Sequence, residues 1–372
     1  MEVGFGSARI TPELPVVLAG FGARKGTVDE VHDDLEAHAI VIKDGDLTLC
    51  LLVLDLLMLG ADYAHPLRKA VSQALGIPAA QVMTSCTHTH SGPAATRSTK
   101  VIGWPAQRGY RERLTERCVD AATVAAACCT PATIKYATAP LPDYLSINRR
   151  GHDYHPTFAV MDFVRPDGVR IGSIANVAIH PVAAGITARS VSRDWVGPFR
   201  DRAAVLTGAP CVLLPGALGD VNPTRDPHTH PDPGGNWETT RELGEEVARN
   251  VSALLDEAQP AGNGAKLIGH RVERIRAGFT LPAVLTLQPG RKVDVELMEW
   301  ALGDVRLISM PGEAFHRLGV EITESRHEDV LLAGLAPHWL GYLPCPFGGG
   351  YEEKMSLGSR FVTTLRTALL HV

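Results

Sequence analysis

The chain has 372 residues, of which 45% are apolar and 21% charged, an ordinary balance for a soluble globular protein with one large domain or two intimate halves. Its net charge is −5 and its basic residues are scattered, so it lacks the electrostatic footprint of a nucleic-acid-binding protein. The N-terminus lacks the basic region and the apolar region of a signal peptide. The most apolar run, Leu47 to Leu59, is interrupted by Asp55 and is too short to span a bilayer, so we expect no stable membrane insertion.

The cysteines indicate a reducing compartment. None belongs to a CxxC pair, and most of the seven lie in apolar stretches: Cys50, Cys86, Cys118, Cys128, Cys129, Cys211 and Cys345. An odd number without metal-type spacing is typical of reduced, buried thiols. We therefore expect a cytoplasmic protein.

The first segment, to about Gly26, contains the run Leu18-Ala19-Gly20-Phe21-Gly22. Unlike the glycines of a dinucleotide-binding turn, these glycines neither follow a strand nor open a helix. We interpret them as a loop that allows another part of the chain to approach the backbone closely.

Downstream, one pattern occurs three times, over about 37–93, 157–223 and 295–344. Each unit begins with two strands around a turn, continues with a helix and returns as a strand. The predicted hairpins pair 38–42 with 47–54, 158–164 with 169–179, and 295–300 with 305–309. In the first unit the predicted helix, 64–75, is followed by the strand that leads to His88. In the second unit helix 198–206 is followed by strand 211–214, and in the third unit helix 314–325 is followed by strand 330–335. A further helix is expected over 239–258.

Apolar runs of this kind are typical of strands buried on both faces, with helices packed outside. The sequence therefore predicts an α/β fold of mixed β-sheets with flanking helices, built from repeated hairpin-helix-strand units within a single domain over 1–372. Polar residues stand at the ends of several strands, where such folds place their sites.

The run Thr87-His88-Thr89-His90-Ser91-Gly92-Pro93 follows the last predicted strand of the first unit. Residues two apart in an extended chain point to the same face, so we expect His88 and His90 to project together. Neighbouring imidazoles suit metal binding or proton transfer, although hydrogen-bonded loop histidines have the same spacing. A second His-x-His, at His228 and His230, lies among prolines and glycines and is interpreted as a solvated loop.

His88 and His180 follow what we interpret as corresponding strand ends, and Glu313 follows the third hairpin. Two histidines and one carboxylate are the ligand set of several hydrolytic zinc sites, which keep a further position for water. Zinc lowers the pKa of that water to about 7, which makes hydroxide available at neutral pH, and it polarises the carbonyl to be attacked.

Three other polar residues each have two interpretations. Asp220 and Asn222 could orient metal ligands or could serve the glycine-flanked turn in which they lie. Asp194 could also support the site, or it could cap a helix before Pro198. Arg149, taken alone, is interpreted as a surface charge.

Short motifs are spread over nearly the whole chain: Gly6-Ser7-Ala8-Arg9-Ile10-Thr11-Pro12, Thr87 to Pro93, Ile147-Asn148-Arg149, Ile179-His180-Pro181, Gly219-Asp220-Val221-Asn222-Pro223, Pro311-Gly312-Glu313 and Gly341-Tyr342. Their joint order is far more specific than any one of them. In these motifs the chain resembles the catalytic domain of the neutral/alkaline, non-lysosomal ceramidase family.

The resemblance implies a ceramidase catalytic-domain-like fold and a set of site residues. It places one zinc ion on four side chains: His88, His180, Glu313 and Tyr342. It places three others against the scissile amide: His90, Arg149 and Tyr351. A tyrosine on zinc would be partly or wholly phenolate. His90 could then move a proton between the zinc water and the leaving amine, and Arg149 could bind an oxyanion or a substrate carboxylate.

The sequence departs from the family pattern at both ends. Ceramidases of this type carry a C-terminal β-sandwich domain, whereas this chain ends at Val372 and begins without a secretion signal, so we expect that domain to be absent. The chemistry should therefore carry over better than the substrate. We expect a zinc-dependent hydrolase that cleaves a C–N amide bond of an N-acyl or related small molecule by attack of zinc-bound hydroxide, with ceramide itself not favoured.

Two alternatives remain. An esterase, lactonase or amide-forming enzyme could use the same zinc site, and a non-catalytic metal- or ligand-binding protein could keep the fold. The expected partner is a small-molecule or acylated substrate rather than nucleic acid, and the sequence leaves formation of a homo-oligomer open.

Overall fold

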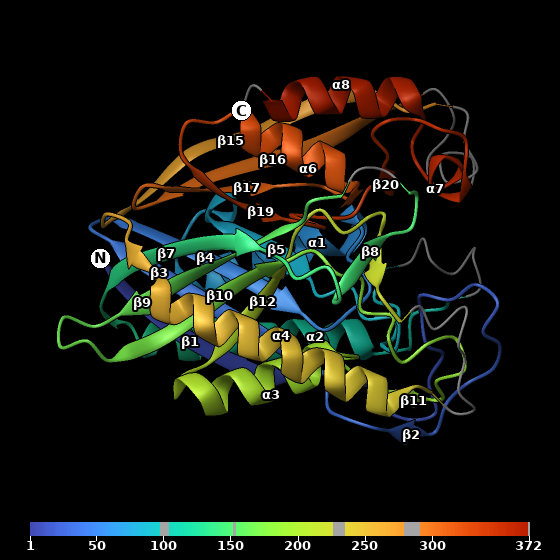
Figure 1. Ribbon diagram of the computed structural model, residues 1–372, viewed down its shortest axis with the longest axis horizontal. Coiled ribbons are helices and arrows are strands. Elements are labelled where there is room, and N and C mark those ends of the chain that lie inside the picture. Colours follow the sequence, from blue (N-terminus) through green and yellow to red (C-terminus); the bar gives the residue numbers. More distant parts are fainter. Residues whose placement is uncertain (97–103, 152–153, 226–234, 279–290, 371–372) are drawn as a thin grey trace.

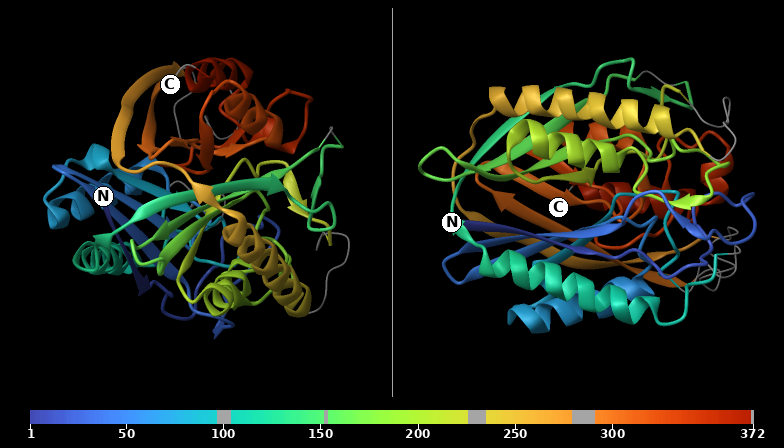
Figure 2. Two further views of the ribbon diagram at one scale, coloured as in Figure 1. Left: turned by 60° about the vertical axis from the view of Figure 1, so that its left-hand side comes forward. Right: turned by 90° about the horizontal axis from the view of Figure 1, so that it is seen from below.

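The structure is a computed structural model that describes residues 1–96, 104–151, 154–225, 235–278 and 291–370. Three larger β-sheets form the framework of this described part of the chain (Figure 1). Each sheet contains an antiparallel hairpin and a later strand that pairs in parallel with the second strand of that hairpin. Figure 2 shows the three sheets with helices on their outer sides. The predicted α/β class with mixed sheets and flanking helices is confirmed.

The first sheet has the order β5-β4-β3-β1-β6. Its strands are β1 (Glu2–Arg9), β3 (Glu36–Asp44), β4 (Leu47–Leu54), β5 (Val82–Cys86) and β6 (Thr130–Pro131). The predicted hairpin is confirmed, with Asp44 opposite Leu47 across the turn. On the outer face, Leu52 and its neighbours pack against α1 (Ala61–Leu75) and α2 (Tyr110–Ala127). A short 3-10 helix, η1 (Ala79–Gln81), precedes β5.

Strand β1 and helix α2 were not predicted from the sequence. Gly4 and Gly6 lie on β1, and a Cβ atom at either would come within 2.3 Å of a carbonyl oxygen of α2. These glycines therefore serve close packing of the strand against the helix. Their effect is to bring α2 directly onto the sheet.

The second sheet has the order β12-β10-β9-β7-β14. Its strands are β7 (Thr133–Pro140), β9 (Thr157–Val164), β10 (Arg170–Val177), β12 (Cys211–Pro215) and β14 (Gln259–Pro260). Helices α3 (Val196–Thr207) and α4 (Trp237–Glu257) cover its outer face, where Trp195, Phe199 and Val247 belong to one buried cluster.

The third sheet has the order β15-β16-β17-β19. Its strands are β15 (Ala265–Arg276), β16 (Lys292–Leu302), β17 (Val305–Ser309) and β19 (Asp329–Ala333). Helices α6 (His316–Glu324) and α8 (Ser359–Leu370) cover its outer face through a cluster that includes Leu318 and Phe361. The predicted helices all occur, with ends within three residues of the expected positions.

The inner faces of the three sheets share one core. Met83 from the first sheet, Met161 from the second and Trp300 from the third lie in the same cluster of buried side chains. Polar contacts join the strand ends: Ser85 Oγ donates to Gly334 O at 2.8 Å, and Asn176 Nδ2 donates to Leu332 O at 2.9 Å. The carboxyl ends of β5, β10 and β19 are therefore held near one another.

Three short strand pairs lie in the connections of the described chain: β2 (Glu30–Val31) with β11 (Ser190–Val191), β8 (Ser146–Asn148) with β13 (Val221–Pro223), and β18 (Glu313–Ala314) with β20 (Tyr342–Leu343). A short helix, α7 (Tyr351–Lys354), follows β20. Among the described helices, none combines the length and apolar content needed to cross a membrane.

Candidate metal centre

Three buried side chains from different sheets converge on one point. His88 follows β5, His180 follows β10 and Glu313 begins β18. His88 Nε2 lies 3.2 Å from Glu313 Oε2, and His180 Nε2 lies 3.4 Å from the same oxygen. None of the three residues is more than 3% exposed.

Backbone carbonyls set the orientation of both imidazoles. His88 Nδ1 lies 2.6 Å from Leu57 O, and His180 Nδ1 lies 3.1 Å from Val221 O. Hydrogen bonding assigns the proton of each neutral ring to Nδ1, so that Nε2 turns a lone pair toward Glu313. A carboxylate oxygen is also an acceptor, so these three atoms attract one another only through a proton or a cation between them.

The spacing of these atoms fits a tetrahedral metal site. Zinc binds nitrogen and oxygen at about 2.0–2.1 Å, which places neighbouring ligand atoms about 3.3 Å apart. The two distances to Glu313 Oε2 are 3.2 and 3.4 Å. Within the described chain, His88 Nε2 and Glu313 Oε2 are buried and have no hydrogen-bond partner. The residues present therefore fit a metal ion.

The electrostatics of the centre suit a cation. Burial acts to raise the pKa of Glu313, but its interactions with His88 and His180 outweigh it and hold that pKa well below its usual range. Burial also lowers the pKa of His180, which favours the neutral form of this imidazole. Trp339 Nε1 donates to Glu313 Oε1 at 2.8 Å and so fixes the carboxylate. The centre combines one carboxylate and two imidazoles as possible metal ligands.

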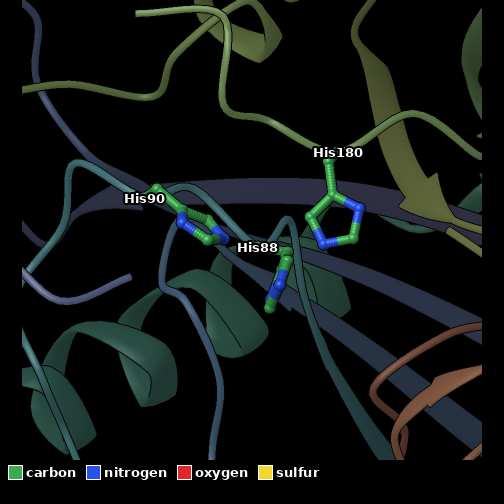
Figure 3. A group of neighbouring side chains, drawn as sticks. All are labelled: His88, His90 and His180. Atoms are coloured by element: carbon green, nitrogen blue, oxygen red, sulfur yellow. The ribbon is translucent and has the colours of Figure 1, made fainter. Parts of the chain in front are cut away.

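His90 lies beside these residues but is held differently. Its ring centroid is 5.0 Å from that of His88 and 5.9 Å from that of His180, and ligand atoms of the three histidines lie within 4.8 Å of one another. Figure 3 shows the three rings around a common space. Both ring nitrogens of His90 are buried without a partner in the described chain. Burial, followed by the charges of His88 and His180, lowers the pKa of His90 well below its usual value.

The predicted glycine loop packs directly on His90. Gly20 has φ +110°, and a Cβ atom there would lie 2.5 Å from His90 Cγ. The ring of Phe21 stands edge-on to the imidazole at 4.8 Å, and Arg24 Nη1 donates to His90 O at 2.6 Å. The close backbone approach expected of these glycines is thus an approach to the site.

Tyr342 reaches the centre because β18 and β20 are paired in parallel. Glu313 and Tyr342 are opposite each other in that register. Burial, followed by the charge of Glu313, raises the pKa of Tyr342 well above its usual value. The ring of Tyr351 lies edge-on to that of Tyr342 at 6.1 Å, and Tyr351 is 61% exposed. Tyr351 therefore stands at the outer side of the centre.

Arg149 follows β8 and is not a free surface charge. Its Nη2 donates to Gly219 O at 2.6 Å, and its Nη1 lies 2.6 Å from Glu352 Oε1. Burial acts to lower the pKa of Arg149, but the opposite charges of Tyr342, Glu352 and Glu313 outweigh it and raise that pKa. The guanidinium is thus held within electrostatic reach of the centre.

Two of the three remaining candidates, Asp194 and Asp220, accept hydrogen bonds from neighbouring backbone. Asp194 accepts hydrogen bonds from the backbone N–H groups of Ala183 and Ala184, just beyond His180, while Trp195 is the N-cap of α3. Burial raises the pKa of Asp194 to about 6, against the effect of its backbone hydrogen bonds. Asp220 accepts from Asn148 Nδ2 at 2.8 Å and from the backbone of His316 at 2.7 Å. Asn222 is buried on β13 opposite Ile147.

Two interpretations from the sequence are wrong in their local geometry. Strand β5 ends at Cys86 and His88 has φ +72°, so the extended backbone expected here is wrong, although the rings of His88 and His90 do lie together, with centroids 5.0 Å apart. His88 follows the parallel strand of its unit, whereas His180 follows the second hairpin strand, so their strand ends are not equivalent. The rings meet because the carboxyl ends of β5 and β10, although in different sheets, are held near one another. His228 and His230 lie outside the described residues.

Several contributors had no signal in the sequence. The carbonyls of Leu57 and Val221 carry no side-chain information, and Trp339 and Glu352 belong to no motif that we singled out. Their part in the site follows only from the arrangement of distant segments.

This arrangement of sheets and strand ends is a neutral-ceramidase-like fold. The structure of neutral ceramidase from Pseudomonas aeruginosa is similar with a TM-score of 0.80 and 18% sequence identity, covering 99% of this chain and 73% of that chain. A structure described as ceramidase complexed with C2 gives a TM-score of 0.78 and 18% identity, covering 100% of this chain and 73% of that one. No protein-family model and no curated protein sequence matches this chain. The likeness shows the fold, which confirms the predicted ceramidase catalytic-domain-like architecture.

Proposed function

We propose that this protein is a zinc-dependent hydrolase that cleaves the C–N amide bond of an N-acyl or related small molecule. The convergence of His88 Nε2, His180 Nε2 and Glu313 Oε2, at the spacing of ligands on one ion, carries the proposal. The neutral-ceramidase-like fold supports an amide as the bond that is cleaved.

In this proposal His88, His180, Glu313 and Tyr342 hold the ion. When bound, zinc supplies Lewis-acid activation of water and of the substrate carbonyl. Burial keeps the phenol of Tyr342 protonated in the absence of a cation, and the nearby charge of Arg149 acts in the opposite direction. Arg149 therefore favours the phenolate that a metal ligand requires.

His90 carries protons in the proposed reaction. A buried, neutral imidazole without a fixed partner can accept a proton and pass it on. Because its pKa is lowered, the imidazolium form of His90 is a stronger acid than an ordinary imidazolium, which suits protonation of a leaving amine. This separates His90 from His88, whose Nδ1 is tied to a carbonyl.

Arg149 provides the proposed oxyanion contact. Two of its nitrogens are occupied by Gly219 O and Glu352, while its Nε is buried without a partner in the described chain. The fixed guanidinium can direct that N–H at developing negative charge without rearranging. Tyr351, at the outer side of the centre, can contact the acyl or amine part of the substrate.

The test is metal analysis combined with a panel of fluorogenic N-acyl amides, from short acyl chains to ceramide, and their matching esters. We expect about one tightly held zinc per chain, amide turnover that a chelator abolishes, and recovery when zinc is returned. His88→Ala should lose both the zinc and the turnover. A metal-free protein with full activity, or a zinc protein that cleaves esters and none of the amides, would contradict the proposal.

A further inference from the structure

A second group of potential metal ligands lies where α1 meets the third sheet. His65 is on α1, Glu296 is on β16, and His338 is in the segment after β19. One ligand atom from each lies within 4.8 Å of the others. None of these residues belongs to the candidate metal centre described above.

His338 is the buried member of this group. It is 0% exposed, and within the described chain neither of its ring nitrogens has a hydrogen-bond partner. Its ring lies edge-on to that of His65, with centroids 5.3 Å apart. A buried imidazole whose polar atoms are unsatisfied costs free energy, which a bound ligand would offset. Burial lowers the pKa of His338 to about 4, so its lone pair is available at neutral pH.

Glu296 is already fixed in position. His270 Nε2, from β15, lies 2.5 Å from Glu296 Oε1, and Arg68 Nη1 lies 2.5 Å from Glu296 Oε2. His65 Nε2 lies 3.5 Å from the same Oε2. These contacts order the carboxylate before any ion binds, which lowers the entropic cost of metal binding.

The charges and exposure of the group determine which ion it suits. Arg68 is buried and fixed by hydrogen bonds to Val82 O and Ala79 O, so a cation must share Glu296 with its guanidinium. The site is therefore weaker than one with an uncompensated carboxylate, and its binding depends mainly on imidazole nitrogen. Imidazole favours Zn²⁺, Co²⁺ or Ni²⁺ over the oxygen-seeking Mg²⁺ and Ca²⁺. The side chain of His65 is 52% exposed, which gives an ion a route in.

We propose that His65, Glu296 and His338 form a second site for a transition-metal ion of the Zn²⁺, Co²⁺ and Ni²⁺ class, with water completing the coordination. His270 and Arg68 hold Glu296 in place. The next residue after His338 is Trp339, whose Nε1 donates to Glu313 Oε1. An ion on His338 would therefore fix the segment that orients the carboxylate of the first centre.

The experiment counts bound metal in untagged protein. Wild-type chain is loaded with one equivalent of Zn²⁺ and then titrated with Co²⁺, followed by calorimetry and by visible ligand-field absorption. We expect His65→Gln to bind one equivalent fewer than wild type, or to bind the second ion about tenfold or more weakly. His65 is exposed, so this variant should fold, and His338→Gln tests the buried ligand in the same way. His327→Gln, at an exposed histidine away from the group, is the matched control and should bind as wild type does.

Three outcomes would overturn the proposal. The first is a wild-type protein that binds no saturable second equivalent. The second is a His65→Gln variant that binds Co²⁺ with wild-type stoichiometry and affinity. The third is loss of the second equivalent from a His228→Gln/His230→Gln variant, which would assign that ion to the other His-x-His. Because the readout is a difference of one equivalent, it does not depend on activity at the first centre.

Discussion

The two histidines of the Thr87–Pro93 run differ in what surrounds them. His88 is anchored at Nδ1 by Leu57 O and turns Nε2 toward Glu313, as a metal ligand must. His90 is enclosed by Gly20 and Phe21, and neither of its nitrogens has a partner in the described chain. This difference supports the proposed roles of His88 as ligand and His90 as proton carrier.

A substitution at His90 tests that difference. We expect His90→Gln to retain its zinc and to lower kcat by about 100-fold, since a positioned acid–base group contributes roughly 10²–10⁴-fold. Zinc content and steady-state kinetics are measured on the same preparation. His88→Ala is the comparison and should lose the metal itself. A His90→Gln protein with normal turnover would remove His90 from the mechanism, and one without zinc would make it a ligand.

At the scale of elements, the loop from Leu18 to Arg24 packs against His90 and forms one side of the site. Gly20→Ala places a methyl group where His90 Cγ lies only 2.5 Å away and also strains a residue with φ +110°. Because small displacements of a reacting group are costly, we expect turnover to fall about tenfold or more with zinc retained. Gly22→Ala is the control, since a Cβ atom there meets nothing within 4 Å. Equal kinetics for the two variants would show that the loop does not position His90.

A charged cluster joins the start of β3 to α3 and the segment before it. Glu36 Oε2 lies 3.2 Å from Arg193 Nη1 and 3.5 Å from Arg200 Nη2, and 3.3 Å from His38 Nε2. Hydrogen bonding with His38, helped by Arg200 and Arg193, outweighs burial and lowers the pKa of Glu36 to about 2. The cluster thereby ties the first sheet to the helical layer of the second.

The pH dependence of stability tests this cluster. A folded-state pKa below the ordinary value of 4.5 means that the stabilisation is present above pH 4.5 and is lost as pH falls through 4.5 toward 2. With allowance for partial exposure, Glu36→Gln should lower the free energy of unfolding by about 1–2 kcal/mol at pH 7. Urea titrations at pH 7 and at acid pH should show this deficit narrowing as the solution is acidified. Glu324→Gln, at an exposed position, is the control, and a deficit independent of pH would contradict the assignment.

At the scale of the whole molecule, the candidate metal centre joins the three sheets. His88 comes from the first sheet, His180 from the second, and Glu313 follows the third sheet's β17. An ion bound to all three links segments that the unfolded chain would release. Metal binding and global stability are therefore coupled.

Thermal unfolding measures that coupling. A ligand that binds only the folded state adds about 4 kcal/mol when its free concentration is 1,000 times its dissociation constant. We expect calorimetry of the wild type to show a higher Tm with one equivalent of zinc than after chelation. The Tm of His88→Ala should change little between the same two conditions. An unchanged wild-type Tm would mean that the ion does not bridge the three sheets.

Local pattern determined much of this protein. Apolar runs around turns that contain Asp and Gly correctly predicted the hairpins, and the apolar spacing of the helices placed most of them, because burial and turn geometry act over a few residues. Helix α2, whose buried face is half alanine, and the polar strand β15 carried weaker patterns, and neither was predicted. The ordered motifs brought His88, His180 and Glu313 forward as one set of candidates.

Only the tertiary structure decided how those candidates meet. The convergence of their ligand atoms depends on three sheets burying one shared core, and the left-handed backbone at His88 overrides the strand periodicity that we expected there. The anchoring carbonyls of Leu57 and Val221, and the contact from Trp339 to Glu313, have no counterpart in local sequence. The reason is physical: sequence patterns report which face of an element is buried, whereas a site at the ends of strands depends on which elements bury one another.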